Sequence, residues 1–344
     1  MPINYFQSIP DGTQQSGYFT RVGMYLYQIC GTSFQSNIPL PELIVCQQPE
    51  PKFTFQLHAG NKRHSKSYRW LNYWYSFDGR VWLAFARIDS GYLLRFPSYA
   101  DFVISTDART ISAYRGGNTP DSSIRHLLLN QVIPIVLSQL GKLVLHASAC
   151  VSPQGVMAFM GTTGMGKSTL AASFGLRGLQ VLTDDCLSIE KQGNDVLCVP
   201  SYAGVRLWPE SITALFAKEP ELQTLAHYTD KKRFVFEQNA SGESLFLKAA
   251  YVLTHPEEDP LGNSISITPL SSGTALLEAV KHTFQLDVTD RERLAQAFKR
   301  YEWLAQSVPF FQLRYPRDHA YLPAVNTAVL EHMARIQNRE AVPA

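Results

Sequence analysis

The sequence lacks both a long apolar run and a recognisable leader. In its most apolar stretch, residues 132–151, no uninterrupted run reaches the roughly 18 residues that a membrane-spanning helix needs. The interrupting residues are Ser138, Gln139, Lys142 and His146. Residues 1–7 contain no basic segment followed by an apolar core, so they do not resemble a signal peptide. We therefore expect no membrane partner and a cytoplasmic location.

The chain also lacks an excess of either charge. Its 31 basic and 29 acidic side chains leave a formal net charge of +2, which gives no electrostatic reason to expect nucleic acid as a partner. A chain with 45% hydrophobic and 17% charged residues is not largely disordered. A length of 344 residues favours two domains of ordinary size, or one large domain with an addition.

Cysteine is scarce and scattered. The five cysteines contain no CxxC pair, and an odd, dispersed set fits neither a zinc site nor a disulfide framework. We expect buried, reduced thiols, which are typical of a reducing cytoplasm. They are Cys30, Cys46, Cys150, Cys186 and Cys198.

The first third of the chain is rich in strand-forming residues. The dipeptide Asp78-Gly79 between strand-like residues 68–75 and 81–88 predicts a β-hairpin. Two interpretations are open for the basic run before it, a solvated loop or a docking site for an acidic peptide: Lys62, Arg63, His64, Lys66 and Arg69. Glycine, proline and serine gather in residues 116–123. We predict a smaller β-rich N-terminal domain over residues 1–120 that docks a substrate or contacts another subunit.

Beyond residue 120, short strands and helices alternate. Apolar spacing predicts a helix over residues 124–140, with a kink at Pro134. Buried strands over residues 143–145, 156–159 and 180–182, with a helix over residues 168–176, predict a three-layer α/β core. The remaining elements are predicted as helices over 271–280 and 290–305, a strand over 310–313 and a helix from Pro323. These elements form the second predicted domain, residues 121–344.

Residues 161–168, GTTGMGKS, match the GxxxxGK[ST] pattern of a P-loop, or Walker A motif. An apolar strand precedes the loop and a helix follows it, as this motif requires. The glycines allow consecutive backbone N–H groups to surround phosphate oxygens at the positive end of the helix dipole. Lys167 is then expected at the β- and γ-phosphates and the Ser168 hydroxyl at Mg²⁺. The predicted nucleotide-binding residues are Gly161, Thr162, Thr163, Gly164, Met165, Gly166, Lys167, Ser168 and Thr169.

Two adjacent carboxylates, Asp184 and Asp185, end the apolar strand that follows the P-loop helix. Carboxylates beside a triphosphate favour two roles, one at the metal ion and one taking a proton from an acceptor hydroxyl. An ordinary solvated strand end is the alternative. His146 ends the strand before the P-loop strand. Taken alone, this histidine is either a hydrogen-bonded structural residue or a catalytic one.

A histidine at a strand end, GxxGxGKS, and a strand ending in Asp-Asp occur here in one order. In this respect the sequence resembles the catalytic domain of the HPr serine kinase/phosphorylase family, related in fold to phosphoenolpyruvate carboxykinase. The resemblance covers about residues 125–240 and implies an α/β P-loop kinase core of that type in residues 121–344. It implies that Asp184 is the general base and that His146 supports it. It also implies that Asp185 and Ser168 bind Mg²⁺.

One signature of the family differs in this chain. The glycine- and arginine-rich segment that the family uses for phosphorolysis is replaced by AGVRLWPE, residues 203–210. The chain is more similar to HPr-kinase-like proteins of biosynthetic clusters, which include kinases that phosphorylate a C-terminal serine of lasso-peptide precursors.

A transferring phosphoryl group also needs positive charge. The candidates are Arg206, Lys231, Lys232 and Arg233, and of these Arg206 and Lys232 are assigned to catalysis.

These observations lead to a hypothesis of function. The chain is expected to be an ATP- and Mg²⁺-dependent kinase that transfers the γ-phosphoryl group to a serine hydroxyl of a peptide or small protein, with a lasso-peptide precursor as one example. The alternatives are a bifunctional HPr kinase/phosphorylase and a non-catalytic, nucleotide-binding regulator. The resemblance also implies a homo-oligomer.

Overall fold

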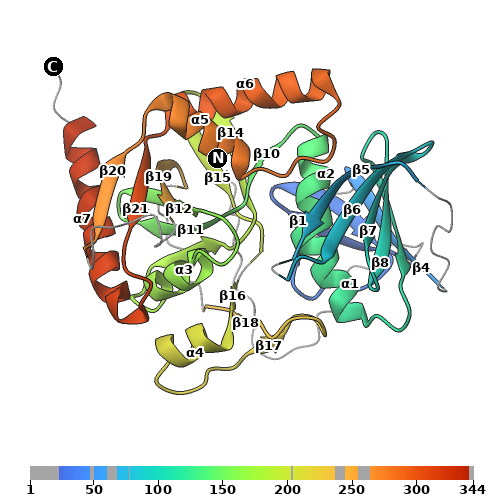
Figure 1. Ribbon diagram of the computed structural model, residues 1–344, viewed down its shortest axis with the longest axis horizontal. Coiled ribbons are helices and arrows are strands. Elements are labelled where there is room, and N and C mark those ends of the chain that lie inside the picture. The colour runs from blue at the N-terminus through green and yellow to red at the C-terminus, as the bar shows by residue number, and fades with distance from the viewer. Residues whose placement is uncertain are drawn as a thin grey trace.

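The computed structural model describes residues 23–46, 50–59, 68–76, 78–202, 204–236, 245–254 and 264–340. Figure 1 shows two packed halves, one built on a large β-sheet and the other on a sheet covered by helices on both faces. The predicted mixed α/β class is confirmed. Most of the basic run before the hairpin, residues 62–66, lies outside the described residues. In the described part, no helix is long and apolar enough to cross a membrane.

The first half contains a nine-stranded sheet of order β3-β1-β2-β4-β9-β8-β7-β6-β5. The pairs β2–β4 and β4–β9 are parallel and the others are antiparallel. Its strands are β1 (Tyr25–Ile29), β2 (Thr32–Ser36), β3 (Ile44–Val45), β4 (Phe53–His58), β5 (Trp70–Tyr75), β6 (Val81–Ile88), β7 (Gly91–Phe96), β8 (Ala100–Ser105) and β9 (Thr110–Arg115).

The hairpin predicted around Asp78-Gly79 is confirmed. Strands β5 and β6 pair antiparallel, with Tyr73 opposite Ala84. Gly79 has φ 77°, a left-handed conformation that glycine adopts without strain. The carboxylate of Asp78 accepts hydrogen bonds from Ser76 Oγ and from the backbone N–H of Arg80, which fixes the turn.

A helical segment follows the sheet in three pieces: α1 (Asp121–Leu127), the π-helix η1 (Leu128–Val132) and α2 (Ile133–Gln139). The Ile133 N–H donates to the Leu128 carbonyl, five residues back, which makes the turn wide. Pro134 explains the wide turn, because its ring would clash with the carbonyl of Asn130, four residues earlier in a regular helix. The kink expected at Pro134 is therefore present as a π turn just before it.

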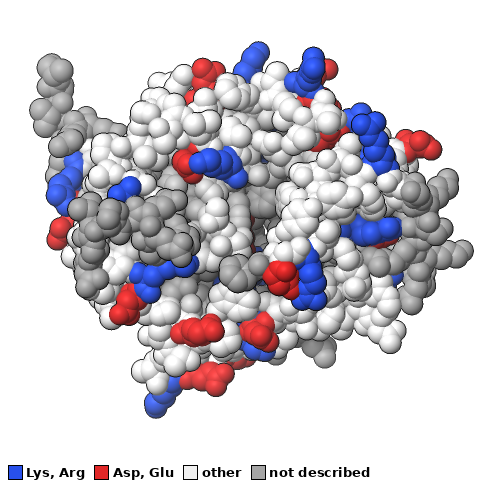
Figure 2. Space-filling view, in the orientation of Figure 1, with Lys and Arg blue, Asp and Glu red and all other residues white. Residues whose placement is uncertain are grey.

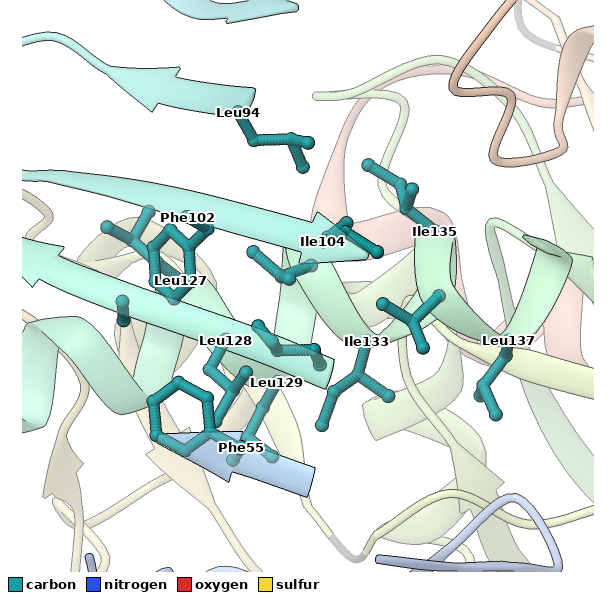
Figure 3. Packing of buried hydrophobic residues seen from close by; sticks show 14 of the residues in the cluster. Phe55, Leu94, Phe102, Ile104, Leu127, Leu128, Leu129, Ile133, Ile135 and Leu137 are labelled. Carbon is teal, nitrogen blue, oxygen red and sulfur yellow. The ribbon is translucent and has the colours of Figure 1, made fainter. Parts of the chain in front are cut away.

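The helical segment packs against the nine-stranded sheet on one side and contacts the second half on the other. Figure 3 shows its apolar residues facing side chains of the sheet, and all of them belong to one buried cluster. Examples are Leu127 beside Phe102, and Leu128 and Leu129 beside Phe55. The same cluster continues into the second half through Val144, Phe284 and Leu286, so the segment joins the two halves. The glycine- and proline-rich residues before α1 form a tight turn within one packing unit.

The second half contains a six-stranded sheet of order β13-β11-β12-β19-β21-β20. The strands β12, β19 and β21 run parallel, and the remaining pairs are antiparallel. The strands are β11 (Ala147–Ser152), β12 (Gly155–Met160), β13 (Gln180–Thr183), β19 (Leu247–Leu253), β20 (Ser266–Pro269) and β21 (Phe310–Arg314).

Helices cover both faces of this sheet and produce three layers. Along β12, Met157 and Phe159 face α3 (Lys167–Gly175) and α7 (Leu322–Glu340), whereas Ala158 and Met160 face α5 (Ser272–Lys281) and α6 (Arg291–Ser307). This division follows from the alternation of side chains along a strand. A three-layer α/β arrangement agrees with the expectation from the sequence, and so do the positions of α3, α5, α6 and α7.

The second half also contains two three-stranded sheets. The first contacts α6, and the second contacts α3. One contains β10 (Leu143–Leu145), β14 (Leu187–Gln192) and β15 (Asp195–Val199). The other contains β16 (Val205–Leu207), β18 (Lys232–Phe234) and β17 (Gln223–Thr224), and α4 (Pro209–Leu215) follows β16. The strand predicted through His146 is divided there, because β10 pairs with β14 while β11 pairs with β12 and β13.

The surface and the cysteines agree with the composition. On the face seen in Figure 2, basic and acidic residues are interspersed and neither sign forms a continuous region. All five cysteines are buried and unbridged, as predicted.

Candidate functional site

The P-loop connects β12 to the N-terminus of α3. Gly161, Gly164 and Gly166 have φ values of 152°, 87° and 88°, which side-chain-bearing residues rarely adopt, so the loop curls as the motif requires. Lys167 is buried, and its Nζ donates to the carbonyls of Gly161 at 2.8 Å and Thr162 at 3.3 Å. Burial lowers the pKa of Lys167, and the nearby carboxylates oppose this effect.

The other P-loop residues differ in what their side chains do. Thr162 and Thr163 are exposed, whereas Met165 is buried in the core between α3 and the six-stranded sheet. Met165 therefore anchors the loop to the core. The Thr169 hydroxyl shares a hydrogen bond of 2.9 Å with Ser211 of α4.

Asp184 is enclosed by hydrogen-bond donors. Its Oδ1 accepts from the hydroxyls of Ser148 at 2.6 Å and Ser168 at 2.8 Å. Its Oδ2 accepts from the backbone N–H of Arg206 at 3.0 Å and from Arg206 Nε at 3.3 Å. The exposed fraction of the Asp184 side chain is 0%. This carboxylate is held in place and has no direct access to solvent.

The pair Ser168–Asp184 has the oxygen chemistry of a magnesium site, in which the sealed Asp184 would act through the Ser168 hydroxyl. A hydroxyl and a carboxylate oxygen 2.8 Å apart are hard ligands of the kind that Mg²⁺ prefers. Among the described residues, no group of three or more His, Cys, Asp or Glu side chains gathers into a metal site. The protein would therefore supply few ligands, which is typical of magnesium sites that are completed by phosphate oxygens and water.

Asp185 lies in a different environment from its neighbour. Its φ of 65° is left-handed, which is strained for a residue with a side chain. Its Oδ1 accepts from His146 Nε2 at 3.2 Å, and its Oδ2 forms an ion pair of 3.1 Å with Arg206 Nη2. The side chain is 26% exposed. Burial alone would raise the pKa of Asp185, but Arg206 and the hydrogen bond from His146 hold it well below the usual range.

His146 is positioned by the bend between β10 and β11. Its backbone N–H donates to the His282 carbonyl at 2.6 Å, and its ring lies 5.9 Å from the ring of Phe284. The resemblance implied that His146 pairs with Asp184, and Asp185 with Ser168. The structure has the opposite pairing, because the left-handed backbone at Asp185 turns its carboxylate toward His146.

Arg206 connects both carboxylates to the first half of the protein. Its Nη2 also donates to the Asp184 carbonyl, and its Nη1 donates to the Tyr202 hydroxyl at 3.1 Å. Burial raises the pKa of Tyr202 to about 12, so its hydroxyl stays protonated and donates to Asn130 Oδ1 at 2.5 Å. Asn130 lies in the π turn η1. A chain of contacts therefore runs from the helical segment of the first half to Asp185.

Sequence reasoning did not find Ser148, Tyr202 or Asn130. Ser148 lies in the segment His146-Ala147-Ser148 that carries the resemblance, but no role was assigned to it. Tyr202 and Asn130 belong to no motif. The only local signal was Pro134, which predicted an irregular helix at the position from which Asn130 reaches the site.

The basic residues at and just before β18 make different contacts. Lys232, which the sequence assigned to catalysis, donates to Thr224 Oγ1 at 3.4 Å. The Arg233 guanidinium instead lies 5.3 Å from the centre of the Tyr202 ring, and Lys231 Nζ lies 5.2 Å from that of Trp208. Because side chains alternate along a strand, Lys232 is not brought to the carboxylate cluster.

A further cation contacts the P-loop from outside the expected set. The guanidinium of Arg317, which follows β21, donates to the Gly164 carbonyl. Arg317 is exposed, so its charge lies at the open side of the loop. No sequence motif marks this residue, because it reaches the loop from a strand far along the chain.

Comparisons with known proteins give little further guidance. No family model matches the chain, and no curated protein matches it. Among solved structures, the chain is similar to the Hpr(Ser) kinase/phosphatase from Coxiella burnetii, at 14% sequence identity and a TM-score of 0.32. The match covers 56% of this chain and 98% of that chain. Similarity at this level carries no functional argument, so the site geometry must provide it.

Proposed function

We propose that the protein is a kinase that uses ATP and Mg²⁺ to phosphorylate a serine hydroxyl of a peptide or small protein. The observation that carries this proposal is the difference between two adjacent carboxylates beside a P-loop. Asp184 is sealed and bonded to Ser168, while Asp185 is ionised and partly exposed. Two carboxylates in such different environments suit the two roles that phosphoryl transfer requires.

The first role is binding of the nucleotide. Backbone N–H groups of the P-loop would hold the phosphates, and Lys167 would exchange the Gly161 and Thr162 carbonyls for phosphate oxygens. Ser168 would hold Mg²⁺, with Asp184 acting through the Ser168 hydroxyl, and the ion would neutralise negative charge on the phosphates. Ser148 and Arg206 keep the Asp184 carboxylate oriented through their hydrogen bonds.

The second role is acceptance of the serine proton by Asp185. A carboxylate with a lowered pKa stays ionised throughout the neutral range, and phosphoryl transfer with a loose transition state does not need a strong base. His146 and Arg206 hold this carboxylate from two sides. The role proposed for Asp185 thus replaces the base implied for Asp184 by the resemblance. The exposed part of Asp185 leaves room for the acceptor to approach from solvent.

The class of acceptor rests on the resemblance in residues 125–240 alone. Proteins similar in that region act on serine hydroxyls, and those of biosynthetic clusters include kinases of lasso-peptide precursors. We therefore propose a peptide or small protein acceptor, with a short precursor peptide ending in serine as the first one to test.

The test is transfer of ³²P from [γ-³²P]ATP, with mass spectrometry to identify the modified residue. The Asp185→Asn variant should lose transfer and still bind Mg²⁺ and nucleotide, whereas Asp184→Asn should lose Mg²⁺-dependent nucleotide binding. Lys232→Ala is the matched control and should keep full activity. Full transfer by Asp185→Asn would exclude the proposed base. Nucleotide binding without transfer to any co-encoded protein would indicate a regulator, and transfer to HPr that phosphate reverses would indicate a bifunctional enzyme.

A further inference from the structure

A cavity of about 370 Å³ lies between the start of β10, the middle of β14 and the C-terminal half of α6. In Figure 1 these elements meet where α6 passes over β14 and β10. None of its lining residues belongs to the P-loop or to the carboxylate cluster. The volume lies near the lower end of small-molecule sites, roughly 300–1,000 Å³, so it suits a molecule of one or two rings.

The cavity is strongly basic. Its wall has a single carboxylate, Glu190, which already accepts from Lys142 Nζ at 2.7 Å. Within the described ranges, no ion pair joins Lys299 or Arg300 to an acidic side chain. The lining therefore has excess positive charge and attracts an anion. The four cationic side chains are Lys142, Lys191, Lys299 and Arg300.

Arg300 combines a place in the cavity wall with one buried donor. Its Nε is buried and has no hydrogen-bond partner in the part of the chain that the structure describes. A buried donor without an acceptor costs on the order of 1–3 kcal/mol, more when the group is charged. Because this atom is closed to solvent, a ligand in the cavity would meet the positive charge of Arg300 rather than this N–H group.

The remaining wall of the cavity is apolar. Leu143, Ile189 and Trp303 form it, and Lys191 Nζ lies 5.7 Å from the centre of the Trp303 ring. A Trp ring beside apolar side chains favours a flat, apolar group. The lining thus combines an apolar surface for a ring with unpaired cations for an acidic group.

We propose that this cavity binds a small aromatic anion, in which one or two rings carry a single acidic group. The rings would lie on Trp303 and the aliphatic residues, and the acidic group would contact Lys299 and Arg300. The proposal does not depend on the kinase activity, because the cavity and the nucleotide site share no residue.

The test uses 1-anilinonaphthalene-8-sulfonate as the anionic probe, with N-phenyl-1-naphthylamine as its uncharged counterpart. Fluorescence titration of the full chain in saturating ATP should show one site. This site should bind the sulfonate at least tenfold more tightly than the uncharged N-phenyl-1-naphthylamine. The double variant Lys299→Gln/Arg300→Gln should weaken this binding at least tenfold, and added salt should weaken it in the wild type. Arg291→Gln removes a charge from the same helix outside the cavity and should change nothing.

Three results would overturn the proposal. They are equal affinities of the wild type for both probes, unchanged binding by the double variant, and displacement of the sulfonate by ATP. If the double variant fails to fold, the comparison of the two probes on the wild type still decides the question, since it needs no substitution.

Discussion

Replacing Tyr202 by phenylalanine should lower kcat for phosphoryl transfer about 30-fold and leave nucleotide affinity unchanged. The Tyr202 hydroxyl accepts from Arg206 Nη1 at 3.1 Å and donates to Asn130 Oδ1 at 2.5 Å. Its loss leaves both buried groups without this partner, and a hydrogen bond to a charged group contributes about 2 kcal/mol. Without this hydrogen bond, Arg206 is less well oriented and the barrier to phosphoryl transfer rises by about 2 kcal/mol. Since kcat falls tenfold for each 1.36 kcal/mol, the expected decrease in kcat is about 30-fold.

The matched control is Tyr228→Phe. The Tyr228 hydroxyl is also largely buried and also contacts the helical segment, through His126 Nδ1 at 2.6 Å, but it is bonded to His126 rather than to Arg206. Both substitutions therefore remove one hydroxyl from the same interface. We expect similar decreases in thermal stability for the two variants, and a fall in kcat for Tyr202→Phe alone.

The assays are steady-state kinetics of ³²P transfer, titration with a fluorescent ATP analogue, and thermal unfolding. Equal kcat values for Tyr202→Phe and Tyr228→Phe would refute the reasoning, because Arg206 would then not depend on the link to Asn130. A weakened nucleotide affinity in Tyr202→Phe would also refute it, since Asp184 keeps its hydrogen bonds from Ser148, Ser168 and the Arg206 backbone.

Three further predictions concern the surroundings of this link. Ser148→Ala should lower the free energy of unfolding by about 2 kcal/mol, measured in urea, because the charged Asp184 loses a buried donor. Arg317→Ala should raise the dissociation constant of ATP several-fold without changing the thermal midpoint, because an exposed cation beside Gly164 is removed. Burial lowers the pKa of His282 to about 4. As the pH falls, His282 therefore binds a proton in the unfolded chain before it does so in the folded protein. The free energy of unfolding should fall by up to about 3 kcal/mol as the pH drops from about 6.5 to 4. Thermal unfolding across this range should show a smaller decrease in His282→Gln.

Local signals predicted much of the fold. The P-loop, the Asp78-Gly79 hairpin and the helices α5 and α6 depend on residues close together in the sequence, and each was found where the pattern placed it. A turn needs particular residues at fixed positions, and an amphipathic helix needs only its own spacing.

The arrangement of the site depends on features that no local pattern contains. Whether His146 faces Asp184 or Asp185 is decided by one left-handed residue at the strand end. Whether Lys232 or Arg233 faces the site is decided by the register of β18 against β16, where Arg206 lies opposite Arg233. A shift of one residue would reverse that outcome, and strands of three residues carry too little pattern to fix it.

The helical segment of residues 121–139 has a consequence for how the chain must be made. Its apolar residues cover the nine-stranded sheet, so the sheet keeps an uncovered apolar face until the ribosome has released about residue 139. A fragment that starts at residue 121 would lack the nine-stranded sheet and would expose the apolar residues of the helical segment. Because Asn130 lies in this segment, the step that completes the first half also supplies the support for Arg206.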